Sequence, residues 1–328
     1  MRIMITGGSG FLGWNLCREL GKRHEVFGSY LQHPCVPDTC SAFKLDVTSR
    51  EEIRSCIEQM KPDVIIHTAA ITNPDHCEKD RGLAKKVNSD ASRIIASLSH
   101  EHSVRLIYVS TDLVFNGEKG SYTEDDEPAP VNYYGDTKLQ GEIAVRELLP
   151  DGVILRVSLM YGWGNGIHGC FTDWMLSTLE KKEKLHLFTD QYRTPTFVND
   201  SVIGFIKVAE DPQATGIFHL AGPERVSRFE FGRVFLNTFG FPDDLIQQVK
   251  QDEISALVPR PKDSSLSIRK FQEHYHFTPQ GIKEGIRAMF EMRNSECGVK
   301  NKRPTRKASA AGGLCRGEPV CSPIEVRE

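Results

Sequence analysis

Thr6-Gly7-Gly8-Ser9-Gly10-Phe11-Leu12-Gly13 is the stretch that decides the fold class of this chain. It follows an apolar run with strand character, Arg2–Thr6, and leads into a helical pattern, Phe11–Lys22. Glycines at this spacing allow a tight turn, close approach of the backbone to a pyrophosphate, and close packing of the helix on the strand. The N-terminus of the helix then offers N–H groups to phosphate oxygens. The pattern predicts a dinucleotide-binding loop whose contacts come from Gly7, Gly10, Phe11, Leu12 and Gly13.

Short apolar runs alternate with helical patterns through the first half of the chain. The expected strands are Arg2–Thr6, Glu25–Tyr30, Phe43–Val47, Val64–His67, Arg105–Ser110 and Val153–Val157. The expected helices between them are Phe11–Lys22, Arg50–Gln59 and Leu83–Leu98. Strands that alternate with helices form right-handed crossovers, and these build a parallel sheet with helices on both faces. We therefore predict an α/β fold, with a doubly wound Rossmann sheet in residues 1–160.

The second half is less regular, and we expect it to form a smaller C-terminal lobe. A strand pattern occurs at Gly216–Ala221, and helical patterns occur at Phe229–Phe239 and Pro279–Met289. We interpret residues 161–293 as mainly a substrate-binding lobe, with some segments that return to the large sheet. Residues 294–328 are basic, rich in small residues and poor in aromatic ones, so we expect a disordered tail.

The composition excludes several classes of protein. A chain of 328 residues with 39% hydrophobic and 26% charged residues suits about two globular domains. A net charge of -3 gives no electrostatic reason to expect nucleic acid as a partner. No run approaches the ~18 apolar residues of a membrane span, and the N-terminus has no secretory pattern. The nine cysteines form no C-x-x-C pair, so we expect reduced thiols, a cytoplasmic location and no metal site.

Several residues outside the glycine loop are candidates for contact with the cofactor. Asp46 is expected to end the third strand beside Val47, where its carboxylate would accept a hydrogen bond from an adenine amine. The alternative is a residue that only starts the next helix. Ala69 and Ala70 are small, as a backbone passing close to a cofactor requires, although tight packing of sheet and helix would also explain them.

The end of the second strand bears on the choice between NAD and NADP. Ser29-Tyr30-Leu31-Gln32-His33 contains no carboxylate, which would hold the ribose hydroxyl of NAD and repel a 2′-phosphate. Its absence permits NADP and mildly favours it. No arginine in this segment confirms that choice, so NAD remains open.

Tyr134 and Lys138 are the candidates for acid–base chemistry. Their spacing places them one turn apart on the same face of a helix. A phenol has a pKa near 10, and a neighbouring ammonium group lowers that pKa by stabilising the phenolate. A surface pair is the alternative. Thr111 lies where a parallel strand ends, the edge at which open α/β sheets bind ligands, and its hydroxyl can donate to a substrate carbonyl.

With these motifs together, the chain resembles the extended short-chain dehydrogenase/reductase superfamily, and within it the dTDP-4-dehydrorhamnose reductase branch. The resemblance spans about residues 1–290. It rests on the order and spacing of Thr6–Gly13, His67–Ala70, Val87–Asn88, Ser110–Phe115, Asn132–Lys138, Gly141–Glu142, Leu155–Val157, Tyr161–Gly162, Asp190–Thr196, Arg260–Pro261 and Asp263–Leu266.

The resemblance implies roles for particular residues. Thr111, Tyr134 and Lys138 would form the catalytic trio, in which Tyr134 protonates the reduced carbonyl oxygen and Lys138 also holds the nicotinamide ribose. Arg193 and Thr196 would lie at the substrate cleft together with Thr111, although a structural ion pair explains Arg193 equally well. Asn88 would be the structural asparagine of the superfamily.

One feature departs from the pattern. An acidic loop linked to magnesium often follows the fourth strand in the dehydrorhamnose reductases. In this chain that loop, Asp75–Asp80, is interrupted by other residues, so we predict no metal site.

Three functions follow, which experiments would separate. The first is an NADP(H)-preferring reductase of a 4-keto sugar nucleotide. Its expected partners are a nucleotide sugar and a second copy of the chain in a homodimer, and we expect neither nucleic acid nor a membrane as a partner. The second is a sugar-nucleotide epimerase with bound NAD. The third is a non-catalytic regulatory subunit that resembles the methionine adenosyltransferase β subunit.

Overall fold

The computed structural model describes residues 1–166, 169–254 and 258–300, with the backbone alone described for residues 296–300. Its centre is a seven-stranded parallel sheet with the strand order β3-β2-β1-β4-β5-β6-β11. The strands are β1 (Arg2–Thr6), β2 (Glu25–Tyr30), β3 (Ser41–Lys44), β4 (Val64–His67), β5 (Arg105–Thr111), β6 (Val153–Val157) and β11 (Gly216–Leu220). This order confirms the predicted doubly wound Rossmann sheet, in which the chain reverses direction between β1 and β4.

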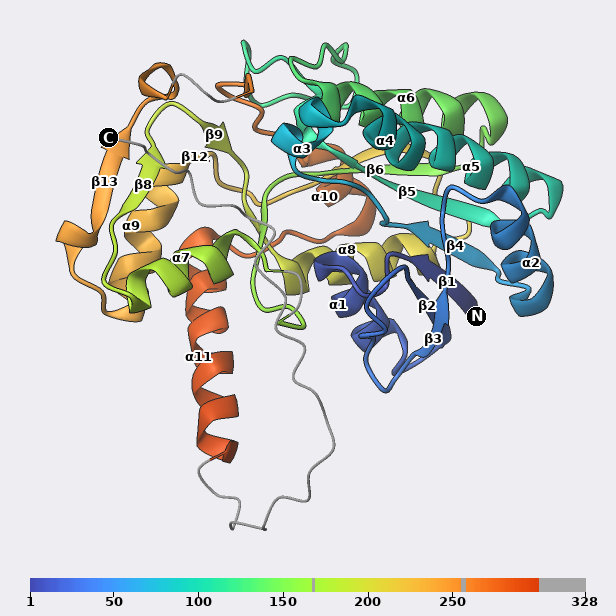
Figure 1. Ribbon diagram of the computed structural model, residues 1–328, viewed down its shortest axis with the longest axis horizontal. Coiled ribbons are helices and arrows are strands. Elements are labelled where there is room, and N and C mark those ends of the chain that lie inside the picture. The colour runs from blue at the N-terminus through green and yellow to red at the C-terminus, as the bar shows by residue number, and fades with distance from the viewer. Residues whose placement is uncertain (167–168, 255–257, 301–328) are drawn as a thin grey trace.

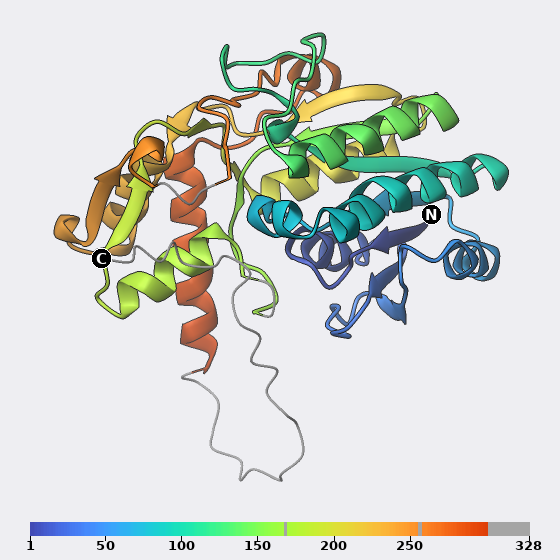
Figure 2. The ribbon, with the colours of Figure 1, turned by 45° about the horizontal axis from the view of Figure 1, so that its top comes forward.

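Helices cover both faces of the sheet, as Figures 1 and 2 show. One face carries α1 (Phe11–Leu20), α8 (Val198–Glu210) and α10 (Arg269–Tyr275). The other face carries α2 (Arg50–Met60), α5 (Ala91–Glu101) and α6 (Tyr133–Leu148). Both layers are needed because β4 is buried along its whole length, and a strand buried on both faces is apolar throughout.

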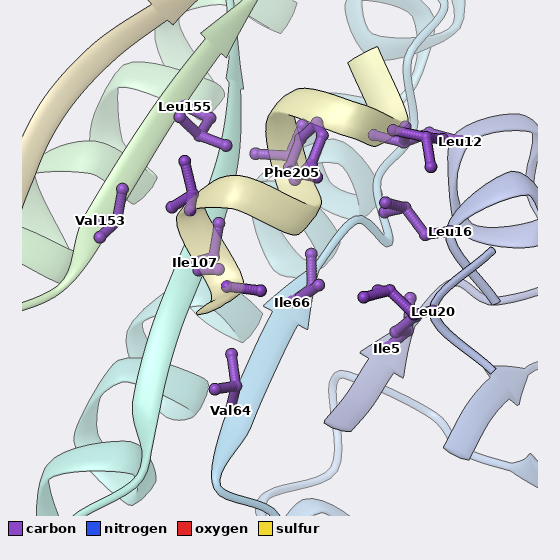
Figure 3. Close-up of a cluster of buried hydrophobic side chains, with 14 of the residues drawn as sticks. Ile5, Leu12, Leu16, Leu20, Val64, Ile66, Ile107, Val153, Leu155 and Phe205 are labelled. Atoms are coloured by element: carbon purple, nitrogen blue, oxygen red, sulfur yellow. The ribbon is translucent and has the colours of Figure 1, made fainter. Parts of the chain in front are cut away.

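Successive side chains of each strand point to opposite faces of the sheet, so the core of the sheet is divided into two clusters, one on each face. Ile3 and Ile5 face α1 and α8, whereas Met4 faces α2 and α5. Figure 3 shows the first cluster, in which Phe205 of α8 lies close to Ile107 of β5 and Leu155 of β6. The first cluster therefore joins a helix from the second half of the chain to strands from the first half.

The edge strand β11 is closed to further pairing by two side chains. Glu124 accepts a hydrogen bond from the backbone N–H of His219 at 2.8 Å, and Lys270 donates to the carbonyl of Ile217 at 2.6 Å. Backbone groups on an exposed edge otherwise invite pairing with another chain.

A smaller lobe lies at one end of the sheet (Figure 1). It packs α7 (Phe171–Glu180), α9 (Arg228–Phe239) and α11 (Ile282–Lys300) against the parallel pair β8 (Leu185–Phe188) and β13 (Ile246–Val249). Two-residue strands link the lobe to the sheet: β7 (Met160–Tyr161) pairs with β10 (Thr196–Phe197), and β9 (Tyr192–Arg193) with β12 (Val226–Ser227).

Most element ends lie within a few residues of the predicted ones, and three larger differences affect the site or the tail. β3 ends at Lys44, so Asp46 lies beyond the strand rather than at its end. The helix expected over Leu83–Leu98 is α4 (Arg81–Ala84), a π-helical turn η1 (Lys85–Asp90) and α5, and α3 (Pro74–Lys79) precedes it. α11 continues seven residues into the segment expected to be a disordered tail, whereas residues 301–328 lie outside the described part of the chain.

Within the described ranges, no helix combines the length and the apolar character needed to cross a membrane.

Candidate active site

The glycine loop connects β1 to α1 through a very close approach of backbone segments. Gly7 has a φ of +71°, and a Cβ there would lie 2.9 Å from the backbone of Ala69. A Cβ on Gly13 would lie 2.1 Å from the carbonyl oxygen of Gly7. Gly10 donates from its N–H to that same carbonyl at 2.9 Å. Gly7 and Gly13 therefore have a clear geometric reason to lack a side chain, and a Cβ on Gly10 would lie a tight 3.2 Å from the Gly7 carbonyl oxygen.

The start of α1 fits a pyrophosphate. Its N-cap is Gly10, whose lack of a side chain leaves the first turn without a side-chain cap, and no acidic residue lies in that turn. The N–H groups of Phe11 and Leu12 belong to this first turn, where no intrahelical acceptor exists. A helix that begins with uncapped donors and no competing carboxylate is suited to bind phosphate. The residues of this loop therefore fit the phosphates of a dinucleotide.

Ser29, near the end of β2, and Asp46, just after β3, are the positions that the sequence relates to the adenosine of a cofactor. The Ser29 hydroxyl accepts a hydrogen bond from the N–H of Gly7 at 3.0 Å, so the end of β2 directly supports the loop. One carboxylate oxygen of Asp46 accepts from the N–H and hydroxyl of Thr48, at 2.9 and 2.7 Å. These bonds lower the pKa of Asp46 and fix the turn before α2. Val47 packs in the core beneath, and contact of either residue with adenine stays a prediction.

Tyr134 and Lys138 both lie on α6 and are both buried, with 7% and 3% of their surfaces exposed. The Lys138 ammonium lies 4.2 Å from the centre of the Tyr108 ring, a cation–π distance. Tyr134 packs with Cys77 and Ala84, and Ile71 joins this cluster. A hollow of about 500 Å³ opens beside Ile71. Tyr134 and Lys138 are therefore not a pair on the protein surface, which was the alternative interpretation of their spacing.

Burial sets the protonation of both groups. It raises the pKa of the Tyr134 phenol well above 10, and a hydrogen bond with Thr111 only partly opposes this effect. Burial also lowers the pKa of Lys138 to about 7, although the negative charge of Glu142 opposes it. We expected Lys138 to lower the pKa of Tyr134, and in the structure this is wrong. Desolvation of the phenol is the largest cause of the raised pKa, so Tyr134 keeps its proton near neutral pH.

Thr111, at the end of β5, is joined to Arg193 by one carboxylate. The Thr111 hydroxyl donates to one oxygen of Asp112 at 3.1 Å. The other oxygen of Asp112 pairs with Nε of Arg193 at 3.3 Å and accepts a hydrogen bond from Ser264 at 2.7 Å. Arg193 also donates to the carbonyls of Tyr192 and Pro261. These contacts favour the structural ion pair over direct contact of Arg193 with substrate.

Thr196 lies apart from this group. It is fully buried in β10, and its hydroxyl donates to the carbonyl of Thr194 at 3.4 Å. The structure therefore brings together Thr111, Tyr134 and Lys138, adds Arg193 through Asp112, and leaves Thr196 turned into the interior. Its contact with substrate stays a prediction with less geometric support than the others.

Asn88 connects the segment after β4 to α6. It lies in the π-helical turn, and its amide both accepts from the N–H of Ile71 at 2.8 Å and donates to the Ile71 carbonyl at 3.0 Å. It also donates to the hydroxyl of Thr137 at 3.1 Å. π-helical turns are frequent at functional sites because the extra residue redirects side chains. Here the turn fixes Ile71 relative to Lys138, the residue after Thr137.

Glu142 and Arg156 form a second buried ion pair directly beneath the site. Arg156 donates through Nε and Nη2 to the two oxygens of Glu142, at 2.9 and 2.7 Å. Ser110, which precedes Thr111, also donates to this carboxylate. Glu142 lies one turn after Lys138 on α6, so the pair joins the helix that carries Lys138 to the strands β5 and β6.

The acidic loop after β4 contacts a segment from the second half of the chain, at Val258 and Arg260. Asp75 pairs with Arg260 at 2.7 Å and accepts from the N–H of Val258 at 3.4 Å. Among the described residues, no group of three or more His, Cys, Asp or Glu side chains is arranged to hold a metal ion.

Comparison with known proteins places this fold and site in a family. The family model described as the RmlD substrate binding domain matches residues 1–294. The chain belongs to the RmlD substrate-binding domain family. This confirms the resemblance to the dehydrorhamnose reductase branch of the extended short-chain dehydrogenases/reductases, and it covers both the sheet and the smaller lobe.

Individual RmlD-type relatives are similar over nearly their whole length. The probable low-salt glycan biosynthesis reductase Agl14 of Haloferax volcanii is 31% identical over 88% of this chain and 97% of its own. The methionine adenosyltransferase 2 subunit beta of Xenopus laevis is 31% identical over 83% of this chain and 82% of its own. The dTDP-4-dehydrorhamnose reductase of Bacillus anthracis, solved in complex with NADP, has a TM-score of 0.78 and 29% identity, and covers 89% of this chain and 99% of its own.

The sequence prediction for this RmlD-family chain left an ion pair of Arg193 open as an alternative, and it overlooked the buried pair of Glu142 and Arg156. A signal for the overlooked pair was present, because Arg156 interrupts the otherwise apolar strand Val153–Val157 and a buried charge requires a partner. Its partner, Glu142, could not be read from the sequence, since it lies on a helix that crosses over the sheet.

Proposed function

We propose that this protein reduces the 4-keto group of a sugar nucleotide with NADPH as the hydride donor. The observation that carries the proposal is the buried Tyr134 phenol, which is hydrogen-bonded with Thr111 at the end of β5 and lies one turn before Lys138 on α6. A reductase needs a protonated acid at the carbonyl oxygen, because the oxygen gains a proton as the carbon gains hydride. The reductase named for the Bacillus anthracis relative, in complex with NADP, supports the same choice.

Different residues of this chain would bind the cofactor, orient the carbonyl group and donate the proton. The glycine loop would hold the pyrophosphate, and Lys138 would bind the nicotinamide ribose. When bound, NADPH supplies the hydride. The Thr111 hydroxyl, which donates to Asp112 in the structure, would turn to donate to the carbonyl oxygen and orient it. The Tyr134 phenol would then give its proton to that oxygen, and its low exposure would exclude water from the transfer.

The proposal also covers the cellular location and the oligomeric state of the protein. Five of the described cysteines, Cys17, Cys40, Cys56, Cys77 and Cys170, are free thiols, which supports a cytoplasmic location. We also propose a homodimer, which the mass of the protein in solution tests. The preference for NADP over NAD rests on the absence of a carboxylate at the end of β2, at Ser29 and Tyr30.

The test combines binding with turnover. NADPH and NADH are added separately to the purified protein, and the unfolding temperature is measured; a ligand at ~100 times its Kd stabilises the fold by about 2.7 kcal/mol. NADPH oxidation is then followed with a panel of 4-keto sugar nucleotides. Tyr134→Phe should lower kcat by about 10²–10⁴ and leave NADPH binding intact, because it removes the proton donor alone. Tyr133→Phe, at the half-buried neighbour, is the control and should retain activity.

The two alternatives predict different results, and no geometric feature of the described residues favours them. Activity that needs no added reductant, with NAD that copurifies, would indicate an epimerase. Absence of turnover across the panel, together with tight binding of another enzyme, would indicate a regulatory subunit of the kind named for the Xenopus laevis relative. Either result would overturn the proposed reduction.

A further inference from the structure

Two cysteines that are distant in sequence meet beneath the glycine loop. Cys17 lies on α1, and Cys40 lies just before β3 at the end of the segment that follows β2. Both sulfur atoms lie 2.8 Å from the position that a Cβ on Gly28 would occupy. Only a glycine at this position in β2 leaves room for the two sulfurs. The missing side chain of Gly28 therefore provides the space in which the two sulfurs lie.

The backbones around the two cysteines are also held close together. The hydroxyl of Thr39, which precedes Cys40, donates to the carbonyl of Cys17 at 3.2 Å. A Cβ on Gly21, at the end of α1, would lie 2.1 Å from the carbonyl oxygen of Thr39. A disulfide requires Cα atoms within about 7 Å, and this close packing of the two segments supplies that proximity.

The two thiols differ in access and in acidity. Cys17 is fully buried, and the pKa of its thiol is raised by its hydrogen bond to Cys40 and by burial. Cys40 is half-buried, and the pKa of its thiol is lowered by the hydrogen bond with Cys17. Because the thiolate is the reactive form, the accessible Cys40 is the thiol that would react first with an oxidant from solvent.

We propose that Cys17 and Cys40 form a reversible disulfide when the protein meets a peroxide, and that this bond ties the segment after β2 to α1. The Cys40 thiolate attacks a peroxide oxygen, the O–O bond breaks, and Cys40 becomes a sulfenic acid. The Cys17 sulfur then attacks the Cys40 sulfur, the S–S bond forms, and water leaves with the oxygen. Two thiols lose two electrons and two protons, and hydrogen peroxide is reduced to two waters.

The bond would act on cofactor binding, a consequence that rests on the proposed function. The sulfurs must approach each other to about 2.05 Å. This movement draws Cys40 toward α1 over Gly28, whose Cα already lies 2.7 Å from the Cβ position of Gly8. Ser29, the next residue of β2, supports the N–H of Gly7. We therefore expect oxidation to weaken NADPH binding severalfold.

The test uses the full chain and hydrogen peroxide. Protein treated with one to five equivalents is alkylated, digested and analysed by mass spectrometry. A peptide pair that joins Cys17 to Cys40, 2 Da lighter than its reduced halves and released by dithiothreitol, is the expected product. Closing a segment of this length should also raise the unfolding temperature by about 5 °C. Cys40→Ser should abolish both effects, whereas Cys56→Ser, at another half-buried thiol, should preserve them.

Other outcomes would overturn the inference. Cys40 recovered as a free thiol, as a sulfinic acid or joined to Cys35 instead of Cys17 would exclude the bond. NADPH titrations of the reduced and oxidised protein test the consequence separately. Equal Kd values in the two states would exclude the effect on the loop. Absence of NADPH binding in both states would contradict the proposed function, while the mass spectrum would still decide whether the disulfide forms.

Discussion

The carboxylate of Asp112 pairs with the guanidinium of Arg193 at 3.3 Å, and at most 6% of either side chain is exposed. Asp112 directly follows Thr111 and also accepts a hydrogen bond from its hydroxyl. Arg193 comes from β9, a two-residue strand at the boundary of the smaller lobe. The pair therefore joins the lobe to the end of the central strand that carries the proposed carbonyl-binding hydroxyl.

Arg193→Ala should destabilise the protein strongly. The substitution leaves Asp112 as a buried charge without its cation, which costs about 3–5 kcal/mol. Urea unfolding measures the loss. The control is Arg93→Ala, which removes an exposed ion pair with Glu147 and should cost less than about 1 kcal/mol. A loss as small as the control's, accompanied by a large rise in KM for the sugar nucleotide, would assign Arg193 to substrate binding instead.

Gly13→Ala should abolish NADPH binding. The added Cβ would lie 2.1 Å from the carbonyl oxygen of Gly7, so the loop must move away from the start of α1. Isothermal titration with NADPH measures the effect. Gly82→Ala is the matched control, because a Cβ there would meet only the carboxylate of Asp80 at 3.7 Å. Unchanged affinity in the Gly13 variant would show that the loop does not hold the cofactor.

The kcat/KM for NADPH should fall as the pH rises through about 7. Burial lowers the pKa of Lys138 to about 7, so the free protein loses the ammonium charge above that pH. Below pH 7 the charge is present and kcat/KM should reach a plateau. Lys207→Met, at a half-buried lysine of α8, should leave the profile unchanged. A profile that stays flat between pH 6 and 8.5 would contradict a role for the Lys138 charge.

Glu142→Gln should move that same fall to lower pH. The Glu142 carboxylate raises the pKa of Lys138 against the effect of burial, so its removal lowers the pKa further. The variant should also lose about 3–5 kcal/mol of stability, because Arg156 is left without its anion. Glu147→Gln, on the same helix but exposed, is the control. A variant that is destabilised yet keeps the original pH profile would give Glu142 a structural role only.

The free energy of unfolding should fall as the pH drops from 7 to 5. Burial lowers the pKa of His67 and of His219 to about 3, so the unfolded chain binds more protons than the native protein between pH 6.5 and 3. The stability contributed by the neutral rings is complete above pH 6.5 and is lost progressively below it. The loss at pH 5 is on the order of 2 kcal/mol for each ring.

Denaturant unfolding at several pH values, with His67→Asn beside the wild type, measures this effect. The neutral His67 ring lies within hydrogen-bond distance of two hydroxyls, Thr6 at 2.7 Å and Ser92 at 3.2 Å, contacts that an asparagine amide partly replaces. The variant should lose less stability between pH 7 and 5 than the wild type does. His100→Asn, at an exposed position of α5, should keep the wild-type dependence. Equal slopes in the wild type and the His67 variant would refute the assignment.

The sequence predicted the parts of the molecule that depend on local spacing. The glycine loop and the pair Tyr134 and Lys138 are each encoded within a few residues, so their geometry follows from one turn or one helix. Asp46 was expected at the end of a strand, but β3 stops at Lys44, because pairing with β2 rather than β propensity sets its length. The π-helical turn at Asn88 also escaped prediction, since its helical pattern continues through it.

Features that depend on contacts between distant segments could not be predicted. The sequence left two roles open for Arg193, a structural ion pair and a contact with substrate. Only the approach of β9 to Asp112 in the folded protein distinguishes these two roles. Cys17 and Cys40 showed no motif, because their proximity depends on Gly28 in the strand between them. The sequence therefore predicted which residues carry the chemistry, but not the buried charges that hold them in place.

The side chains of Glu124 and Lys270, which are hydrogen-bonded to backbone groups of β11, limit how this sheet can be extended. A strand donated by a neighbouring molecule would have to break both contacts before it could add to this edge. Cross-molecular strand exchange and fibrillar stacking are thus disfavoured at this end of the sheet, which leaves β3 as the border from which such assembly would have to start.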